Sequence, residues 1–263
     1  MRCYEYEEYN FNNPLLDVEA TYIIHLQGNG RYESIIDQLH KYPISKKVYI
    51  VLNKGYKKCK KNAAIIKPPL DLIDAFLEIF NHAKNKKNIL ILEDDFMFDD
   101  NILDPFHQKN VNHFIKEKQE EQFLYYIGVL PFVLIPYNYY NYIGFSCGTH
   151  SVVYSKKMRE TILNDKTIKN DWDVYINLNH TLNRYIYYTP LCYQLFSETE
   201  NATYWGSHNT INLAFILKFI LKLFNLDKSI TAYSYFYFVS KLWILLFLFI
   251  IWILLTFIIS LKM

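Results

Sequence analysis

The segment Leu242–Leu261, LWILLFLFIIWILLTFIISL, restricts the fold of this chain more than any other feature. It contains 20 residues without a charge, and lysines flank it at positions 241 and 262. A helix of that length crosses a hydrocarbon core of about 30 Å. A soluble core has no need of so long an uncharged run, so we expect residues 242–261 to form a transmembrane anchor.

The charges around this segment predict its orientation. Lysines lie on its N-terminal side at positions 218, 222, 228 and 241, and only Lys262 and Met263 follow it. Because positive charge tends to stay in the cytoplasm, we expect a single-pass membrane protein with a C-terminal anchor and a cytoplasmic domain. The first residues, MRCYEYEEYNFNNP, are polar and acidic, and they predict no cleavable secretory signal.

Residues 211–230 precede the anchor and are expected to form an amphipathic juxtamembrane segment. Their central part, LAFILKFILKLF, places Lys218 and Lys222 one helical turn apart among apolar residues. One interpretation is a helix that lies in the membrane interface. The other is a core helix whose two lysines extend their charged ends to the surface.

Composition narrows the functional classes. The 28 basic and 26 acidic residues nearly balance and no long basic block occurs, so we expect no nucleic-acid partner. The four cysteines, at positions 3, 59, 147 and 192, are far apart and form no C-x-x-C pair. A zinc site or a redox pair is therefore not expected, and a reducing compartment fits at least as well as an oxidising one.

Strand and helix patterns alternate along the rest of the chain. Apolar, β-branched or aromatic runs predict strands at 21–26, 47–52, 88–92, 123–130, 151–154 and 185–188. Apolar residues at helical spacing predict helices at 31–40, 70–83 and 156–163. This alternation indicates an α/β fold with a largely parallel sheet. We expect a polar lead-in at 1–20 and one domain at 21–210.

The stretch Asn88–Phe98, NILILEDDFMF, carries the strongest chemical signal. An apolar strand runs directly into three acids, Glu93, Asp94 and Asp95. In open α/β sheets, ligands gather at the carboxyl ends of strands. Crowded carboxylates repel one another unless a cation binds, and oxygen ligands suit Mg²⁺ or Mn²⁺. Such a metal completes its shell with water and substrate phosphates.

Three other kinds of site also place acids at the end of a strand. A P-loop NTPase needs G-x-x-x-x-G-K-[ST], and no Gly-Lys-Ser or Gly-Lys-Thr occurs here. A receiver-type acidic pocket fits the acids but gives no reason for a membrane anchor. A solvated strand end without a ligand remains open on this stretch alone.

The order of several segments adds a resemblance. They are IIHLQGNGR (23–31), LEDD (92–95), YYIGV (125–129), GTHSVVYSKKMRETIL (148–163), NDWDVYIN (170–177) and TPLCYQLFSETEN (189–201). Together they resemble the GT-A glycosyltransferases, in particular family 25, the lipooligosaccharide and procollagen galactosyltransferase group. The resemblance covers about residues 21–205. It departs at 66–83, where IKPPLDLIDAFLEIFNHA replaces the Gly-Cys-x-x-Ser-His segment of that family.

The resemblance implies a GT-A-like (Rossmann-like) mixed sheet flanked by helices. It also implies metal-dependent, inverting sugar transfer from a nucleotide-sugar, UDP- or GDP-linked, to a hydroxyl of a glycan, lipid-linked or protein acceptor. The resemblance also assigns roles to single residues. Glu93 and Asp95 would bind Mn²⁺ or Mg²⁺, and Arg31, Asp94 and His150 would bind the donor diphosphate. Asp171 and Asp173 are the candidate bases.

Two alternatives to glycosyl transfer stay open. A nucleotidyltransferase uses a similar strand-end metal site, but it normally has a Gly-rich phosphate-binding turn near the N-terminus. Only Gly28-Asn29-Gly30 suggests such a turn. A non-catalytic, membrane-tethered scaffold with a degenerate fold is the second alternative, and the retained acids argue against it.

Overall fold

A computed structural model describes residues 2–167, 171–179, 181–194, 219–226 and 229–260. Its strands are β1 (Tyr4–Asn10), β2 (Ala20–Leu26), β3 (Lys47–Asn53), β4 (Asn88–Glu93), β5 (Phe96–Phe98), β6 (Leu124–Pro136), β7 (Asn141–Ser155), β8 (Arg184–Tyr187) and β9 (Cys192–Gln194). Its helices are α1 (Tyr32–Lys41), α2 (Pro68–His82), α3 (Pro105–Lys118), α4 (Lys156–Asn164), α5 (Trp172–Leu178) and α7 (Ile230–Ser260), with a 3-10 turn, η1, at Asp100–Leu103.

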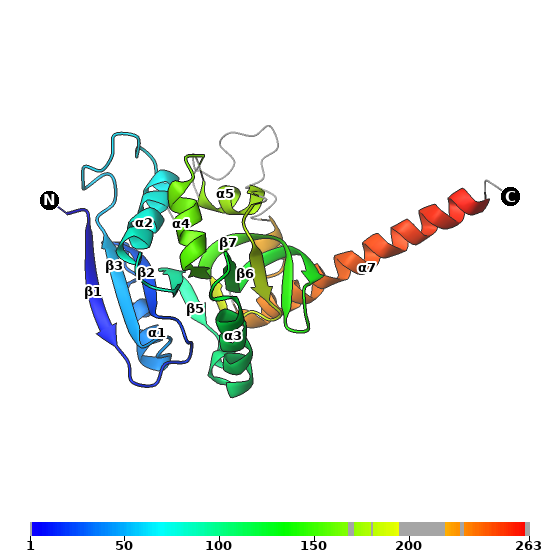
Figure 1. Cartoon of the computed structure of the whole chain (residues 1–263), viewed down its shortest axis with the longest axis horizontal. Helices are drawn as coiled ribbons and strands as arrows, with labels where there is room; N and C mark the ends of the chain where they lie inside the picture. Colours follow the sequence, from blue (N-terminus) through cyan, green and yellow to red (C-terminus); the bar gives the residue numbers. More distant parts are fainter. Residues whose placement is uncertain (1, 168–170, 180, 195–218, 227–228, 261–263) are drawn as a thin grey trace.

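The central strands are buried on both faces, which explains their continuous apolar sequence. In β2, Tyr22 and Ile24 belong to one hydrophobic cluster and Ile23 belongs to the other. The first cluster includes residues of α2, α4, α5 and α7, and the second includes residues of α1 and α3. The sheet is therefore the middle layer of three (Figure 1).

The sheet has seven strands in the order β1-β3-β2-β4-β7-β6-β8. β2 pairs in parallel with β3 and β4, as the alternation of strands and helices predicts. The expectation of a largely parallel sheet is nevertheless wrong, because β1 and β7 join this group in the antiparallel sense. The mixed α/β sheet flanked by helices is confirmed.

The predicted strands at 123–130 and 151–154 are the inner parts of one long hairpin, β6–β7. β8 pairs with β6 in the parallel sense and with the start of β7 in the antiparallel sense. The hairpin therefore curls so that both of its strands contact β8. The outer half of the hairpin, residues 131–150, was not predicted as strand. Apolar side chains lie on both of its faces, so its sequence lacks the alternation of apolar and polar residues that is typical of a strand.

Residues 4–10 belong to the domain and not to a lead-in. β1 pairs along its whole length with β3. Just before β1, Cys3 forms a disulfide with Cys59 in the loop after β3. This bond joins cysteines that are 56 residues apart, and only the pairing of β1 with β3 brings them together. Disulfides are typical of oxidising compartments, and the sequence did not predict this pair.

Helix α7 has two different parts. Tyr233, Phe236, Tyr237 and Ser240 are buried against the domain. From Leu242 to Leu255 the side chains are exposed or half-exposed, and the helix projects from the domain without a break (Figure 1). The segment 230–255 is long and apolar enough to cross a membrane, and only 6% of its most apolar stretch is buried inside the protein. The predicted start of the anchor at 242 matches this change, and residues 261–263 lie outside the described residues.

The described part of the juxtamembrane segment, residues 219–226, packs on the domain. Leu221 and Leu226 are buried in the same cluster as α7, whereas Phe219 and Leu223 are exposed. These residues match the core-helix interpretation more closely than a helix that lies wholly in the interface. Lys218 is outside the described residues.

The disulfide predicts a specific pattern of stability losses. Cys3→Ser and Cys59→Ser should each lower the free energy of unfolding by about 2–4 kcal/mol, since a cross-link limits the unfolded chain. The double variant should cost no more than either single variant, because both remove the same bond. Thermal melts with and without reductant measure this. Reductant should shift the parent chain and leave the double variant unchanged, and equal shifts in both would contradict the bond.

Candidate active site

Asp94 is clamped by the end of β2 and the loop that follows it. Its Oδ1 accepts a hydrogen bond from Arg31 Nη1 at 2.6 Å. Its Oδ2 lies 2.5 Å from Asn29 Nδ2, 3.2 Å from the Leu26 amide and 3.3 Å from His25 Nδ1. Burial opposes ionisation, but the His25 hydrogen bond and the Arg31 charge hold the pKa of Asp94 below its usual value. Asp94 therefore ties β2 to β4.

The turn after β2 has the backbone shape that this clamp needs. Gly28 and Gly30 flank Asn29 and have φ values of +85° and +79°, a region that side chains with a Cβ rarely adopt. The turn directs Asn29 and Arg31 back toward β4. A Cβ on Gly28 would lie 3.6 Å from Lys58 Nζ, so a second cation stands beside the same turn.

Asp95 follows the clamp and is buried at 7% exposure. Its Oδ2 accepts a hydrogen bond from Gln194 Nε2 at 3.0 Å and lies 3.4 Å from Arg31 Nη1. Its Oδ1 is buried and has no hydrogen-bond partner among the described residues. Burial, followed by the charge of Asp94, raises the pKa of Asp95 to about 6. Asp95 thus presents one unsatisfied acceptor.

Glu93 occupies the last position of β4. Its Oε1 accepts a hydrogen bond from Thr149 Oγ1 of β7 at 2.7 Å. Burial, followed by the charges of Asp95 and Asp173, raises the pKa of Glu93 well above its usual value. Both Asp95 and Asp173 therefore act on Glu93, which makes one electrostatic cluster of the three carboxyl groups.

Asp173 reaches this cluster from α5. Its Oδ2 accepts a hydrogen bond from the Gly148 amide at 3.2 Å, and Gly148 has a φ of +88°. Its Oδ1 is buried and unpaired among the described residues. Burial, followed by the charge of Asp171, raises the pKa of Asp173 to about 7. A carboxyl group with that pKa changes its protonation state near neutral pH.

The two candidate bases have different surroundings. The Asp171 side chain caps α5 by accepting a hydrogen bond from the Val174 amide at 3.1 Å, which is a structural role. Trp172 between them is 2% exposed and stacks on Phe76 with ring centroids 4.4 Å apart. The core position of Trp172 gives it no exposed ring face, and Asp173 is the acid of this pair that joins the cluster.

His150 lies deeper than its predicted role requires. It is 0% exposed, and its ring packs edge-on against Tyr233 of α7. Neither ring nitrogen has a hydrogen-bond partner among the described residues. Burial lowers the pKa of His150 to about 4, so the ring is neutral at neutral pH. In this position it offers neither a charge nor an exposed atom to a diphosphate.

The fit of the site to a divalent metal rests on the unpaired oxygens. In the described part of the chain, no three His, Cys, Asp or Glu side chains surround a common metal position. The cluster nevertheless holds more buried acid than its donors satisfy, as Asp95 Oδ1 and Asp173 Oδ1 show. Carboxylate oxygens of this kind suit Mg²⁺ or Mn²⁺, with the remaining ligands coming from water and a substrate.

Four residues that support the site were not assigned roles from the sequence: His25, Asn29, Thr149 and Gln194. All four lie inside the motifs IIHLQGNGR, GTHSVVYS and TPLCYQLF. Their roles depend on pairings between strands that are distant in sequence, such as β9 lying across β6. A Cβ on Gly128 of β6 would lie only 1.9 Å from the Cys192 carbonyl of β9.

Comparison with known proteins gives little further information. No protein-family model matches this chain, and no curated protein matches it. Among solved structures, A197 from STIV is 14% identical, with a TM-score of 0.43 over 69% of this chain and 86% of the other. A glycosyltransferase involved in the glycosylation of the major capsid of PBCV-1 is 9% identical, with a TM-score of 0.40 over 68% of this chain and 94% of the other. At these TM-scores, neither likeness supports an argument about function.

The acid cluster predicts an unusual dependence of stability on pH. Unfolded Asp and Glu titrate near pH 4, whereas Asp95 and Asp173 titrate at about 6 and about 7 in the fold. Between these values the folded state holds more protons than the unfolded state. The free energy of unfolding should therefore fall as pH rises from about 4 to about 7. The lowered pKa of Asp94 acts in the opposite sense, below that window.

Thermal melts at pH 5 and pH 8, with and without Mn²⁺, measure this dependence. Mn²⁺ should raise the melting temperature more at pH 8, where the carboxylates are ionised. Asp95→Asn should flatten the decline and reduce the Mn²⁺ effect. Equal Mn²⁺ shifts in Asp95→Asn and in the parent chain would contradict a metal at Asp95.

Proposed function

We propose that this protein is a metal-dependent glycosyltransferase that moves a sugar from a nucleoside-diphosphate donor to an acceptor hydroxyl. The observation that carries the proposal is the cluster formed by Glu93 and Asp95 at the end of β4 and Asp173 of α5, in which two buried oxygens, Asp95 Oδ1 and Asp173 Oδ1, have no hydrogen-bond partner among the described residues. A buried excess of acid is costly unless a cation shares the site. The order of segments that resembles family 25 supports the choice of donor and reaction.

The metal, when bound, would neutralise the charge that develops on the departing diphosphate. Asp95 is the leading ligand because its Oδ1 is unpaired while Gln194 and Arg31 hold its other oxygen. The charges of Asp95 and Asp173 both act on Glu93, and Glu93 would help to bind the same cation. Asp94 positions Arg31, whose guanidinium keeps one positive charge beside both aspartates.

Asp173 is the acceptor base in this proposal. A general base works best when its pKa lies near the working pH, and the pKa of Asp173 is about 7. Among the described residues its Oδ1 makes no hydrogen bond, and the nearby Thr149 hydroxyl donates to Glu93. Inversion at the anomeric carbon needs one such base, opposite the leaving diphosphate.

A panel of UDP- and GDP-sugars, assayed for Mn²⁺-dependent hydrolysis, tests the reaction class. Turnover of at least one donor is expected for the parent chain. Asp95→Asn should reduce it by about two to three orders of magnitude, since a preorganised electrostatic contact to the leaving group is lost. Mn²⁺-dependent turnover of nucleoside triphosphates alone would instead favour a nucleotidyltransferase. Absence of both activities and of Mn²⁺ binding would favour the scaffold.

Asp171→Asn and Asp173→Asn form a matched pair of variants. They distinguish the helix-capping role of Asp171 from the proposed catalytic role of Asp173. Asparagine caps helices as well as aspartate does, so Asp171→Asn should keep both stability and turnover. Asp173→Asn keeps the shape but cannot take a proton, and it should lose sugar transfer while retaining Mn²⁺-induced stabilisation. Transfer rates and melting temperatures of the two variants measure this. Equal transfer rates would show that Asp173 is not the base.

A further inference from the structure

The outer half of the β6–β7 hairpin has an exposed apolar face. Val133, Ile135, Ile143 and Phe145 are each between 37% and 47% exposed. Val133 is paired with Phe145 and Ile135 with Ile143, so the four side chains form one continuous patch across the two strands. We call this patch the hairpin face. On such a strand the solvent side normally carries polar residues, so a hairpin face of this composition indicates an apolar partner.

Helix α7 shows where the bilayer surface must lie. Ser240 donates a hydrogen bond to the Pro131 carbonyl, and Lys241 Nζ donates one to the Tyr188 carbonyl at 2.7 Å. The next residue, Leu242, begins the exposed apolar run, and residues 242–260 cover about 28 Å at the helical rise. That length matches a hydrocarbon core, so its near boundary lies at Lys241.

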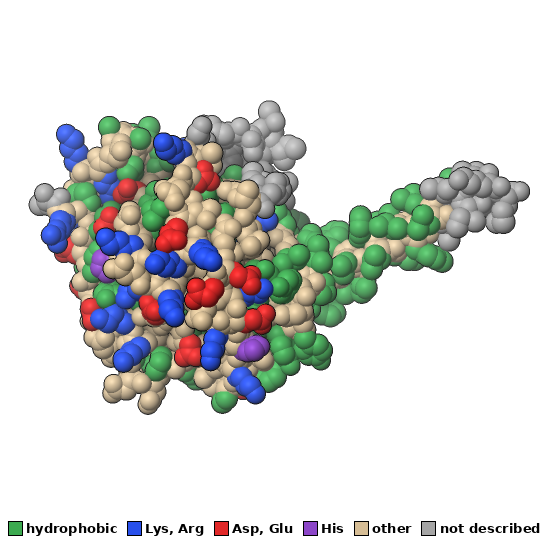
Figure 2. Space-filling model, viewed as in Figure 1, with side chains coloured by type: hydrophobic (Ala, Val, Ile, Leu, Met, Phe, Trp, Pro, Cys, Tyr) green, Lys and Arg blue, Asp and Glu red, His purple; other side chains and the backbone are tan. Residues whose placement is uncertain are grey.

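The hairpin face is continuous with this boundary. Phe132 connects the two, with ring centroids 5.7 Å from Phe145 and 6.4 Å from Phe236 of α7. In Figure 1 the hairpin lies beside the point where α7 leaves the domain, and Figure 2 shows hydrophobic side chains gathered there. The helix runs unbroken out of the domain, so the bilayer meets this side of the molecule at a fixed height.

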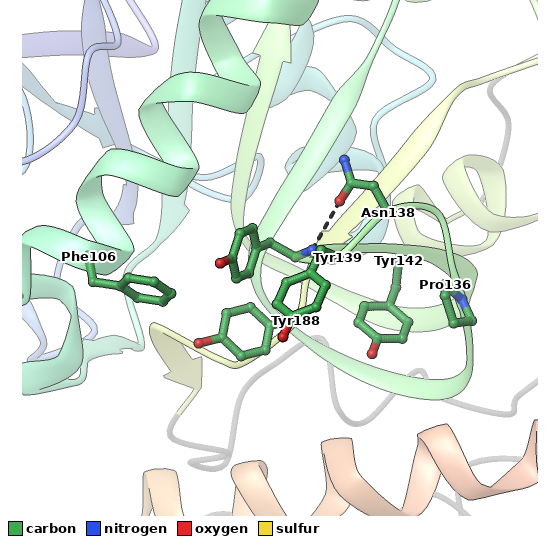
Figure 3. Close-up of a pocket in the computed structure, with 7 residues that line it drawn as sticks. Phe106, Pro136, Asn138, Tyr139, Tyr142 and Tyr188 are labelled. Atoms are coloured by element: carbon green, nitrogen blue, oxygen red, sulfur yellow. Dashed lines mark hydrogen bonds between the residues drawn. The ribbon is translucent and has the colours of Figure 1, made fainter.

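Aromatic residues gather around Lys241 and the nearby hairpin tip. Tyr139 is 85% exposed, and Lys241 Nζ lies 5.0 Å from the ring centre of Tyr142 and 5.6 Å from that of Tyr188. These rings share a cavity of about 670 Å³ with four further residues (Figure 3), namely Phe106, Pro136, Asn138 and Tyr140. Tyrosine is enriched at the membrane–water interface because its ring is apolar and its hydroxyl is polar.

We propose that the hairpin face and Tyr139 dock into the lipid–water interface of the same bilayer that α7 crosses. The occupant is the lipid surface, because the helix already brings that apolar phase to the level of Lys241 and the hairpin face adjoins it through Phe132. The domain then has two membrane contacts, a spanning helix and an interfacial hairpin, which fix its orientation.

Fluorescent labels on the full chain in phosphatidylcholine vesicles test the docking. Ile135→Cys and Tyr139→Cys each carry an environment-sensitive dye, and Ser34→Cys on the exposed side of α1 is the control position. The parent chain gives the background from its own cysteines. The dyes at 135 and 139 should shift to the blue and lose intensity when the lipid chains are brominated near the glycerol, and the dye at 34 should do neither. A blue shift without quenching would show a second protein copy on the face and overturn the proposal, as would quenching no greater than at 34.

A second set of variants separates docking from anchoring. Val133→Ser with Phe145→Ser should reduce the quenching at Tyr139→Cys, while the chain still resists alkaline extraction from the vesicles. Ile66→Ser is the matched control, since Ile66 is 72% exposed in the loop before α2 and should leave the quenching unchanged. Unchanged quenching in the double variant, or alkaline release of the parent chain, would overturn the proposal. Sugar transfer is not a readout here, so the outcome is independent of the proposed function.

Discussion

The burial of several like charges at the end of β4 is the constraint on which the site depends. The clamp on Asp94 makes that burial tolerable, because its oxygens are satisfied by groups from the end of β2 and the turn after it. One acid is thereby converted into a structural link between two parallel strands. The neighbouring acids, Glu93 and Asp95, keep raised pKa values, and Asp95 Oδ1 has no hydrogen-bond partner among the described residues. A single tripeptide thus contains both the residue that holds β2 to β4 and two candidate metal ligands.

The motif at the end of β4 was predictable because its signal is local. An apolar strand followed by acids places carboxylates at a sheet edge whatever the rest of the chain does. Strand β2 and the turn after it, with Gly28, Gly30 and Arg31, were equally predictable, since closely spaced glycines after an apolar run indicate a turn. The resemblance gave Asp94 to the donor diphosphate, whereas the position of the β2 turn in space shows that its oxygens are already held by groups of this chain.

Other features depend on contacts between distant segments, and no local pattern encodes them. The Cys3–Cys59 bond follows from the antiparallel pairing of β1 with β3. The separate environments of Asp171 and Asp173 follow from the start of α5, which makes one a cap and turns the other toward Gly148. The depth of His150 depends in part on α7 packing against β6 and β9, which brings Tyr233 edge-on to its ring. Each of these required the tertiary arrangement.

Helix α7 and the acid cluster are parts of one structure. The backbone amide of Gln194 donates a hydrogen bond to the Tyr233 hydroxyl of α7 at 3.4 Å, and its side chain donates one to Asp95 at 3.0 Å. Two hydrogen bonds therefore connect the anchoring helix to the leading candidate metal ligand. Because α7 also buries Phe236 and Tyr237 in the core, its first three turns belong to the folded domain. Under the proposal that residues 242–260 cross a bilayer, the helix and the candidate site form one continuous structure, and an acceptor must come to a site held close to the membrane.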